Sequence, residues 1–297
     1  MLWNNEAPID DAEGKERKYG RFRETWRRLK KNKAAMVGLF VLSTLVICAL
    51  FPEKIAPYGY DDQLLSRKFI SPCKQFLFGT DNLGRDIFSR VVFGTRISLQ
   101  IGLISVGISA FLGIVLGSLA GFYGGFIDNR IMRGVDIMLA IPSILLAISI
   151  VAALGPGILN LMIAIGIGST PGFARIVRAS ILGVKEQEFI EAARSIGAGD
   201  VRIIQKHILP NCAAPIIVQA TMSVASAILS AASLSFIGLG VQPPTPEWGT
   251  MLSAGRQFIR DYWYIVTFPG LAIMVTILAL NLFGDGLRDA LDPKLKT

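Results

Sequence analysis

Residues 97–127 read ISLQIGLISVGISAFLGIVLGSLAGFYGGFI, a run without a single charged side chain. A helix needs about 20 apolar residues to cross a bilayer, so this run predicts a membrane span. The composition of the whole chain agrees with it. The chain has 297 residues, of which 52% are hydrophobic and 18% are charged, whereas about a quarter of the residues of a soluble domain are charged.

Apolar blocks of similar length lie on both sides of this run. A first span is predicted at 34–51, where Pro52 ends it, and the uncharged stretch 137–174 is long enough for two more. Gly155-Pro156-Gly157 divides that stretch into a third and a fourth span, and the fourth is expected to bend or end at 169–172, because Pro and Gly interrupt helices. A fifth span is predicted at 212–239 and a sixth at 262–284. The sequence therefore predicts an all-α integral membrane protein with six transmembrane helices.

The basic residues predict how the chain is oriented. Of the net charge of +8, much lies in 15–33, directly before the first span. Such a basic run predicts that the N-terminal tail lies on the cytoplasmic side. Six crossings then return the C-terminus to the cytoplasm. The connections 128–136 and 175–211 are predicted to be cytoplasmic as well. The segment 52–96 fits this rule less well, because it is placed outside and carries many basic residues. A position flanking a membrane span also argues against nucleic-acid binding. An apolar stripe of Phe22, Trp26 and Leu29 is expected to lie on membrane lipid or on a partner.

Several kinds of chemistry are missing from the sequence. There is no GxxxxGK[ST] loop to hold ATP phosphates. His207 is the single histidine, and Cys48, Cys73 and Cys212 are widely spaced, so no metal site, disulfide framework, catalytic site or bound cofactor is expected. The predicted spans hold almost no ionisable residues, which proton- or sodium-coupled carriers usually need. Energy for any transport would therefore come from outside the spans.

The connection 175–211 is the best candidate for a functional segment. A short helix is predicted around Phe189, Ile190, Ala193 and Ile196, which repeat at helical spacing. Gly197 and Gly199 are expected to end it. Asp200 is predicted to cap a second helix, and Pro210 to stop that helix or to join it to the fifth span. The helix is either a lever that docks on a partner or an amphipathic helix that lies on the membrane.

These residues carry a resemblance that favours the lever. Glu191-Ala192-Ala193, followed by Gly197 and Pro210, matches the EAA motif of ABC importer permeases. In that family the segment is the coupling helix that docks on the ATPase subunit. The resemblance assigns this ATPase-coupling role here to a set of six residues: Glu191, Ala192, Ala193, Arg194, Gly197 and Pro210.

Other segments narrow the family. The segments 78–90 (FGTDNLGRDIFSR), 94–98, 242–252 (QPPTPEWGTML) and 284–293 (GDGLRDALDP) resemble the second permease subunits of dipeptide, oligopeptide and nickel importers. The stretch 22–70 resembles the N-terminal part of that group. A local departure is Phe76-Leu77, where the family often has His-Pro. In the 242–252 segment, Trp248 is expected to serve packing.

The resemblance implies a domain organisation and a set of partners. It implies a basic cytoplasmic tail at 1–33, a first span with an external segment at 34–96, a type I ABC importer transmembrane domain at 97–286 and a cytoplasmic tail at 287–297. It further implies a second homologous permease, two ATP-binding subunits that hold ATP and magnesium, and an extracytoplasmic solute-binding protein. The expected location is the plasma (inner) membrane of a bacterium.

The function expected from this resemblance is import of di- or oligopeptides by an ATP-driven permease. The same machinery also serves nickel complexes and glutathione in this family, so those substrates stay open. Two other classes are weaker alternatives. One is an ATP-independent secondary transporter or channel, and the other is a membrane scaffold or enzyme without transport activity.

Overall fold

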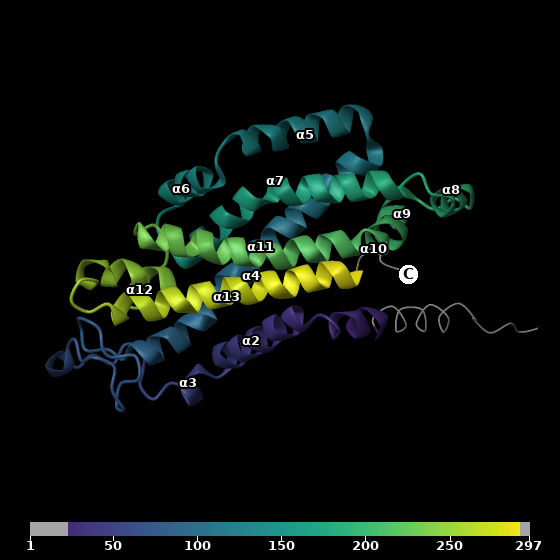
Figure 1. Cartoon of the computed structure of the whole chain (residues 1–297). Coiled ribbons are helices and arrows are strands. Elements are labelled where there is room, and N and C mark those ends of the chain that lie inside the picture. The colour runs from purple at the N-terminus through teal and green to yellow at the C-terminus, as the bar shows by residue number, and fades with distance from the viewer. Residues whose placement is uncertain (1–22, 292–297) are drawn as a thin grey trace, which may run out of the picture.

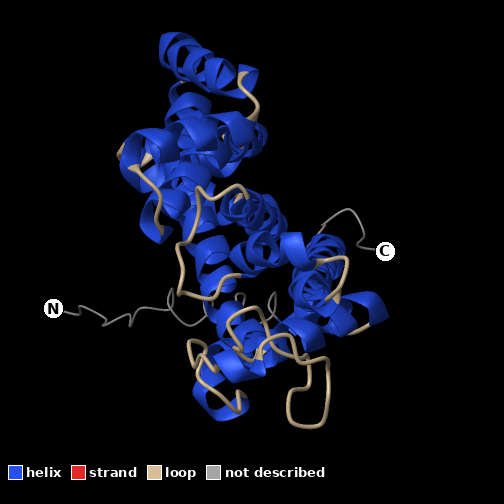
Figure 2. Cartoon of the chain, turned by 90° about the vertical axis from the view of Figure 1, so that its left-hand side faces the viewer, coloured by secondary structure: helices blue, strands red, loops and turns tan. Residues whose placement is uncertain are grey.

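The computed structural model describes residues 23–291, and nearly all regular structure in that range is helical (Figure 2). The described residues contain one isolated β-bridge, between Thr80 and Asp86. Residues 1–22 and 292–297 lie outside the described part, and so do the predictions that concern Phe22 and most of the two tails.

Five helices are long and apolar enough to cross a membrane. They are α2 (Lys33–Leu50), α4 (Ile87–Tyr123), α7 (Ile158–Val184), α11 (Ala213–Phe236) and α13 (Tyr264–Leu291). The pair α5 (Gly125–Ala140) and α6 (Ser143–Leu154) is bent by 90° and makes a sixth crossing when it is taken as one broken span. The prediction of an all-α membrane fold is thus confirmed.

Shorter helices connect these elements. They are α3 (Pro52–Ile55), η1 (Leu65–Arg67), α8 (Glu188–Ser195), α9 (Asp200–Ile203), the π-turn η2 (Ile204–Ile208), α10 (Leu209–Asn211), α12 (Trp248–Gly255) and η3 (Arg256–Phe258). Figure 1 shows α3 and α12 at one end of the bundle and α8, α9 and α10 at the other.

The third predicted span is wrong as a single straight helix. Pro142 restricts Ile141 to extended backbone, at φ −95° and ψ 126°, because a residue before proline avoids the helical region. Helix α5 therefore ends at Ala140, and α6 starts again at Ser143 in a new direction. The 12 residues of α6 span roughly 18 Å, which is too short to cross a bilayer alone.

The fourth span does not end at residues 169–172. Helix α7 continues through Pro171 to Val184, so its last two to three turns project into the stretch predicted as a polar loop. The charges of Arg175 and Arg178 made this part of the helix resemble a polar loop in the sequence. In the structure both arginines form ion pairs with α5. The second span is also longer than predicted, because α4 begins at Ile87 and ends where Gly124 takes a φ of 68°.

The closest packing in the bundle joins α4 to α7. Gly113, Gly117 and Gly121 are spaced four residues apart, so they share one face of α4. A Cβ atom at Gly113 would lie 2.3 Å from Cβ of Phe173, and one at Gly117 would lie 2.6 Å from the carbonyl oxygen of Ala174. The two backbones can approach this closely only because these positions lack side chains, as is common where helices meet in membranes.

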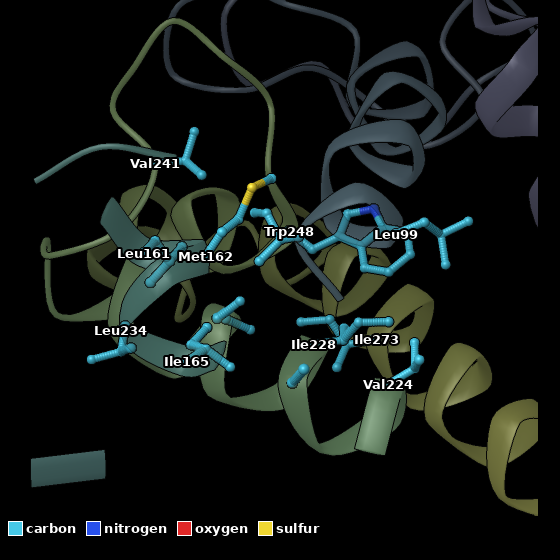
Figure 3. Packing of buried hydrophobic residues seen from close by; sticks show 14 of the residues in the cluster. Leu99, Leu161, Met162, Ile165, Val224, Ile228, Leu234, Val241, Trp248 and Ile273 are labelled. Carbon is cyan, nitrogen blue, oxygen red and sulfur yellow. The ribbon is translucent and has the colours of Figure 1, made fainter. Parts of the chain in front are cut away.

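A large apolar core lies around this pair. Figure 3 shows side chains from α4, α7, α11, α12 and α13 that point toward one another, with Trp248 among them. Trp248 is fully buried, and its Nε1 donates a hydrogen bond to the carbonyl of Val91 at 3.1 Å. The prediction that Trp248 serves packing is therefore confirmed.

Helix α2 is held near its start and at its end. Gly38 packs against the backbone of α13, where an added Cβ would lie 2.7 Å from the carbonyl oxygen of Ala279. At the other end, the Arg96 guanidinium on α4 donates to the carbonyls of Ala49 and Leu50, and it also binds Glu53 at 2.8 Å. Arg96 thus satisfies carbonyls that the end of a helix leaves unpaired.

The segment before α4 satisfies its own charges. Asp81 binds Arg85 at 2.7 Å, and all but a small part of both side chains is buried. Asp86 caps α4 by accepting from the amide of Ser89 at 2.8 Å. Burial raises the pKa of the Asp86 carboxyl, against the hydrogen bonds from Ser89, which lower it. The segment thus forms a loop before α4, in which Asp81 and Arg85 pair with each other.

We expect substitution of Gly117 by leucine to destabilise the subunit, because the new side chain would collide with Ala174 and Val177. Overpacking of this kind costs about 1–3 kcal/mol. Gly107 is the matched control, since it lies on the same helix and an added Cβ there meets nothing within 4 Å. Thermal unfolding of the purified importer in detergent should show a lower midpoint for Gly117→Leu only. Equal midpoints for the two variants would contradict close α4–α7 packing.

Candidate functional site

The candidate site is the short helix α8, which follows the end of α7 (Figure 1). It begins after Gln187 and carries Glu188 and Glu191 in its first turn, where carboxylates stabilise the positive end of a helix. The chain therefore forms a separate helix here, at the end of the bundle where α11 begins.

One face of α8 is anchored in the bundle. Ile190 is fully buried and Ala193 is nearly so. They pack into a second apolar cluster with residues from α4, α7, α9, η2 and the start of α11, which comprises Phe122, Val177, Ile181, Ile203, Ile208 and Cys212. The guanidinium of Arg194 also lies 5.4 Å from the centre of the Phe122 ring, a distance at which a cation is attracted to an aromatic face. These contacts fix α8 to the ends of α4 and α7.

The opposite face of α8 is exposed. Glu191, Ala192 and Ser195 lie on it. Large apolar side chains are exposed beside it: Ile196 is 85% exposed and Val201 is 64% exposed. An apolar patch with carboxylates at its edge is typical of a surface that binds another protein. The helical spacing predicted one apolar face for Ile190, Ala193 and Ile196, whereas the structure buries the first two and exposes Ile196.

Gly197 ends α8 for a conformational reason. Its φ is 79°, a region that side chains other than glycine's disfavour. Its amide donates to the carbonyl of Arg194, and the amide of Ala198 donates to that of Ala193, the paired bonds of a Schellman cap. The prediction that Gly197 ends the helix is confirmed, whereas Gly199 has an ordinary φ of −69°.

One of two predicted local signals differs from the structure. Asp200 is the first residue of α9 and not its cap, because Gly199 holds the capping position and no side chain caps the helix. Of the two outcomes predicted for Pro210, joining the helix to the fifth span is the one observed, since Pro210 lies inside α10, which leads into α11 through Cys212. Pro210 lacks an amide hydrogen, and the neighbouring Asn211 donates its side-chain amide to the carbonyl of His207. The chain thus forms a π-turn and then re-enters a helix.

Two ion pairs connect the same end of α7 to α5. Arg178 binds both carboxylate oxygens of Asp128, at 2.6 and 2.5 Å. Arg175 binds Asp136 at 2.5 Å. Paired bonds of this kind fix orientation as well as distance. The end of α7 therefore holds α8 by apolar contacts and α5 by charge.

The structure places the six predicted site residues in different environments. Glu191 and Ala192 lie on the exposed face, Ala193 faces the core, and Arg194 stacks on Phe122. Gly197 shapes the end of the helix, and Pro210 lies in α10, on the far side of α9. No group of three His, Cys, Asp or Glu residues within 23–291 is placed to hold a metal ion.

Comparison with known proteins identifies the family. Residues 113–297 match the family described as binding-protein-dependent transport system inner membrane component. Residues 20–72 match the N-terminal TM domain of oligopeptide transport permease C. The first match covers more than half of the chain.

Similar proteins match along nearly the whole length. The di/tripeptide transport system permease protein DppC of Pseudomonas aeruginosa (strain UCBPP-PA14) is 51% identical over 92% of each chain. The dipeptide transport system permease protein DppC of Alkalihalophilus pseudofirmus is 50% identical over 93% of this chain and 91% of its own. The glutathione transport system permease protein GsiD of Escherichia coli O157:H7 is also 50% identical, over 92% and 90%.

Solved structures share the fold. An inward-facing structure of the MetNI methionine ABC transporter aligns with a TM-score of 0.56 at 20% identity, and the match covers 69% of this chain and 98% of that one. An amino acid ABC transporter aligns with a TM-score of 0.52 at 16% identity, over 68% and 94%. At such identities the likeness concerns the fold alone, while the sequence matches show that this chain belongs to the binding-protein-dependent permeases, as a membrane transport subunit of an ABC importer and not an enzyme.

Proposed function

We propose that this subunit forms half of a translocation path for di- or oligopeptides and is driven through α8. A second homologous permease forms the other half, two ATP-binding subunits dock on the cytoplasmic side, and an extracytoplasmic solute-binding protein delivers the peptide. ATP and magnesium are held by the ATP-binding subunits. The chain lies in the plasma membrane of a bacterium with both termini in the cytoplasm, and residues 97–286 form its ABC transporter domain.

The observation that carries this proposal is the two-sided character of α8. Its inner face is locked to α4 and α7 through Ile190 and Ala193, while Glu191 and Ala192 are open to a partner. A helix that is fixed on one side and free on the other transmits displacement, because packed cores move as rigid bodies and do not deform gradually. Movement of a docked ATPase would therefore displace α7, and with it α5 through Arg175 and Arg178.

The residues predicted to couple to the ATPase have different tasks in this proposal. Glu191 and Ala192 contact the partner, and the exposed side chains of Ile196 and Val201 extend that contact. Ala193 and Arg194 transmit force into the bundle, and Gly197 sets the shape of the loop. Pro210 acts at a distance, by starting the helix that becomes α11. ATP binding shifts the path between its two states only if the ATPase binds these states with different affinity.

Two peptide classes are supported as substrates by the relatives. Relatives 50–51% identical are named for dipeptide or di/tripeptide transport, and others at 50% for glutathione transport. We favour unmodified di- and oligopeptides, and glutathione is the second candidate.

Uptake by the reconstituted importer tests both the class of transporter and the substrate. We expect proteoliposomes with both permeases, the ATPases and the binding protein to accumulate labelled dialanine only with ATP, and to prefer it to glutathione. Omission of the ATPase subunits is the control. Accumulation by the permease pair alone would show a secondary transporter or channel, and preference for glutathione would replace the substrate proposed here.

Charge reversal at Glu191 should uncouple ATP hydrolysis from uptake. Glu191→Lys places a cation where the partner is expected to meet a carboxylate, and loss of such a pair lowers affinity about tenfold or more. ATPase activity should then no longer respond to loaded binding protein, while the subunit still inserts. Asp261→Lys makes the same charge change at an exposed carboxylate at the opposite end of the bundle. Normal coupling in Glu191→Lys would refute the docking role.

The cap of α8 permits a test with closely matched variants. Valine at Gly197 must adopt a φ of 79°, which costs roughly 1–3 kcal/mol, whereas valine at Gly199 keeps a φ of −69°. An added Cβ meets nothing within 4 Å at either position, so the two variants differ chiefly in backbone strain. We expect Gly197→Val to lower ATP-driven uptake and to speed proteolysis of residues 185–200. The same loss in Gly199→Val would show that the sign of φ is not the cause.

A further inference from the structure

A cavity of about 400 Å³ lies between α7, α11 and α13, apart from the coupling surface. It is lined by Ile176, Pro215, Val218, Gln219, Met222 and Arg288. Arg288 is near the end of α13, and Pro215 and Gln219 are near the start of α11, so the cavity opens toward the end of the bundle that carries α8 (Figure 1). Its volume falls within the range of about 300–1,000 Å³ that is usual for small-molecule pockets.

We propose that this cavity is the inner mouth of the translocation path, where Arg288 binds the free carboxylate of a short peptide and Gln219 and Ser223 bind its backbone. The inference rests on the proposed function, because it takes the subunit to be half of a peptide path. It adds a site, a ligand chemistry and the residues that recognise it.

The charge at the cavity fits a carboxylate. Arg288 is exposed and forms no ion pair with any residue between 23 and 291. Its guanidinium presents donors in a planar fork that matches the two oxygens of a carboxylate. The rest of the lining is apolar apart from Gln219, so the guanidinium is the strongest determinant of which ligand end binds there.

The polar groups of α11 fit a peptide bond. The side-chain amide of Gln219 donates to the hydroxyl oxygen of Ser223 at 3.1 Å. This bond leaves the Gln219 amide oxygen free to accept and the Ser223 hydroxyl free to donate. One acceptor beside one donor is the pattern that a peptide N–H and C=O require.

The same face of α11 carries a polar seam along the rest of the span. The seam consists of Gln219, Ser223, Ser226, Ser230 and Ser233. Steps of four and three residues place them on one side of a helix, and none of them is buried in this chain. The opposite side packs into the core through Val224, Ile228 and Ala231.

A second, smaller cavity extends the polar surface outward. Ser230 lines it together with Ser143 of α6 and Ser169 of α7, and it has a volume of about 20 Å³. Apolar side chains such as Ile165 and Leu234 complete its lining, and a cavity of this size has room for about one water molecule. Serines from three helices thus line one cavity at the seam, which suits a hydrated path better than a surface in contact with lipid.

Cysteine accessibility tests whether the seam is hydrated. The native cysteines Cys48, Cys73 and Cys212 are replaced by alanine, and single cysteines are placed at Ser226 or Ser230 in the complete importer in proteoliposomes without ATP. Leu103→Cys on α4 is the control, because Leu103 is 60% exposed on an apolar span. We expect a charged thiosulfonate reagent to modify the seam cysteines at least about tenfold faster than the control, since thiols react as hydrated thiolates. Rates as slow as the control would overturn the proposal and place the seam against lipid or a tightly packed partner.

Protection by defined peptides tests the role of Arg288. We expect dialanine to protect Ser226→Cys from the reagent at a concentration about tenfold lower than dialanine amide does, as loss of a charge-assisted pair predicts. Arg288→Gln should remove that difference, and Arg288→Lys should keep part of it. Arg260→Gln changes an exposed arginine in the loop before α13 and should leave protection unchanged.

The results of these experiments test the carboxylate site and the proposed function independently. Modification and protection are measured without ATP, so they do not depend on coupling through α8. Failure of the importer to accumulate dialanine would count against the proposed function. Accumulation of dialanine together with equal protection by the two peptides, or with a difference that persists in Arg288→Gln, would overturn the carboxylate site alone.

Discussion

The close contact between α4 and α7 is the constraint on which the rest of the structure depends. Within a bilayer, helices gain little from hydrophobic burial against one another, so association relies on close packing. Gly113, Gly117 and Gly121 allow the backbone of α7 to lie directly on α4. The elements that the proposed coupling uses are attached to this pair: α8 packs on the ends of both helices, and α5 follows α4 and is bound to α7 by two ion pairs.

The attachments of α8 and α5 to α7 differ in physical kind. Helix α8 is held by buried apolar side chains, and these contacts do not require a charged partner. Helix α5 is held by Arg175 and Arg178, whose carboxylate partners are partly exposed. Exposed ion pairs contribute little to stability but select one orientation when they are bidentate. The end of α7 thus holds α8 by apolar packing and holds α5 in one orientation by ion pairs.

Sequence reasoning identified the apolar spans and the glycine that ends α8, because both depend on local composition. The predictions were wrong where residues far apart in the sequence decide the structure. Arg175 and Arg178 made the end of α7 look like a loop, although Asp136 and Asp128 on α5 compensate their charges. The exposed apolar patch at Ile196 and Val201 could not be distinguished from a buried face by spacing alone. Helical periodicity shows that a face exists, and tertiary packing decides which face is covered.

One face of α11 is polar and is not buried by the described residues of this chain. A membrane helix that is apolar all round can contact lipid on any side. Helix α11 differs from such a helix, because Gln219 and four serines form a polar seam along one side. Contact of this seam with lipid hydrocarbon would be unfavourable, because unpaired polar groups find no hydrogen-bond partners there. Ser233 relieves part of that cost by donating to the carbonyl of Leu229, whereas the Gln219 amide oxygen has no partner among the described residues. Water or a second subunit must therefore cover this face, and a path that two such faces enclose would be polar along its length and apolar toward the lipid.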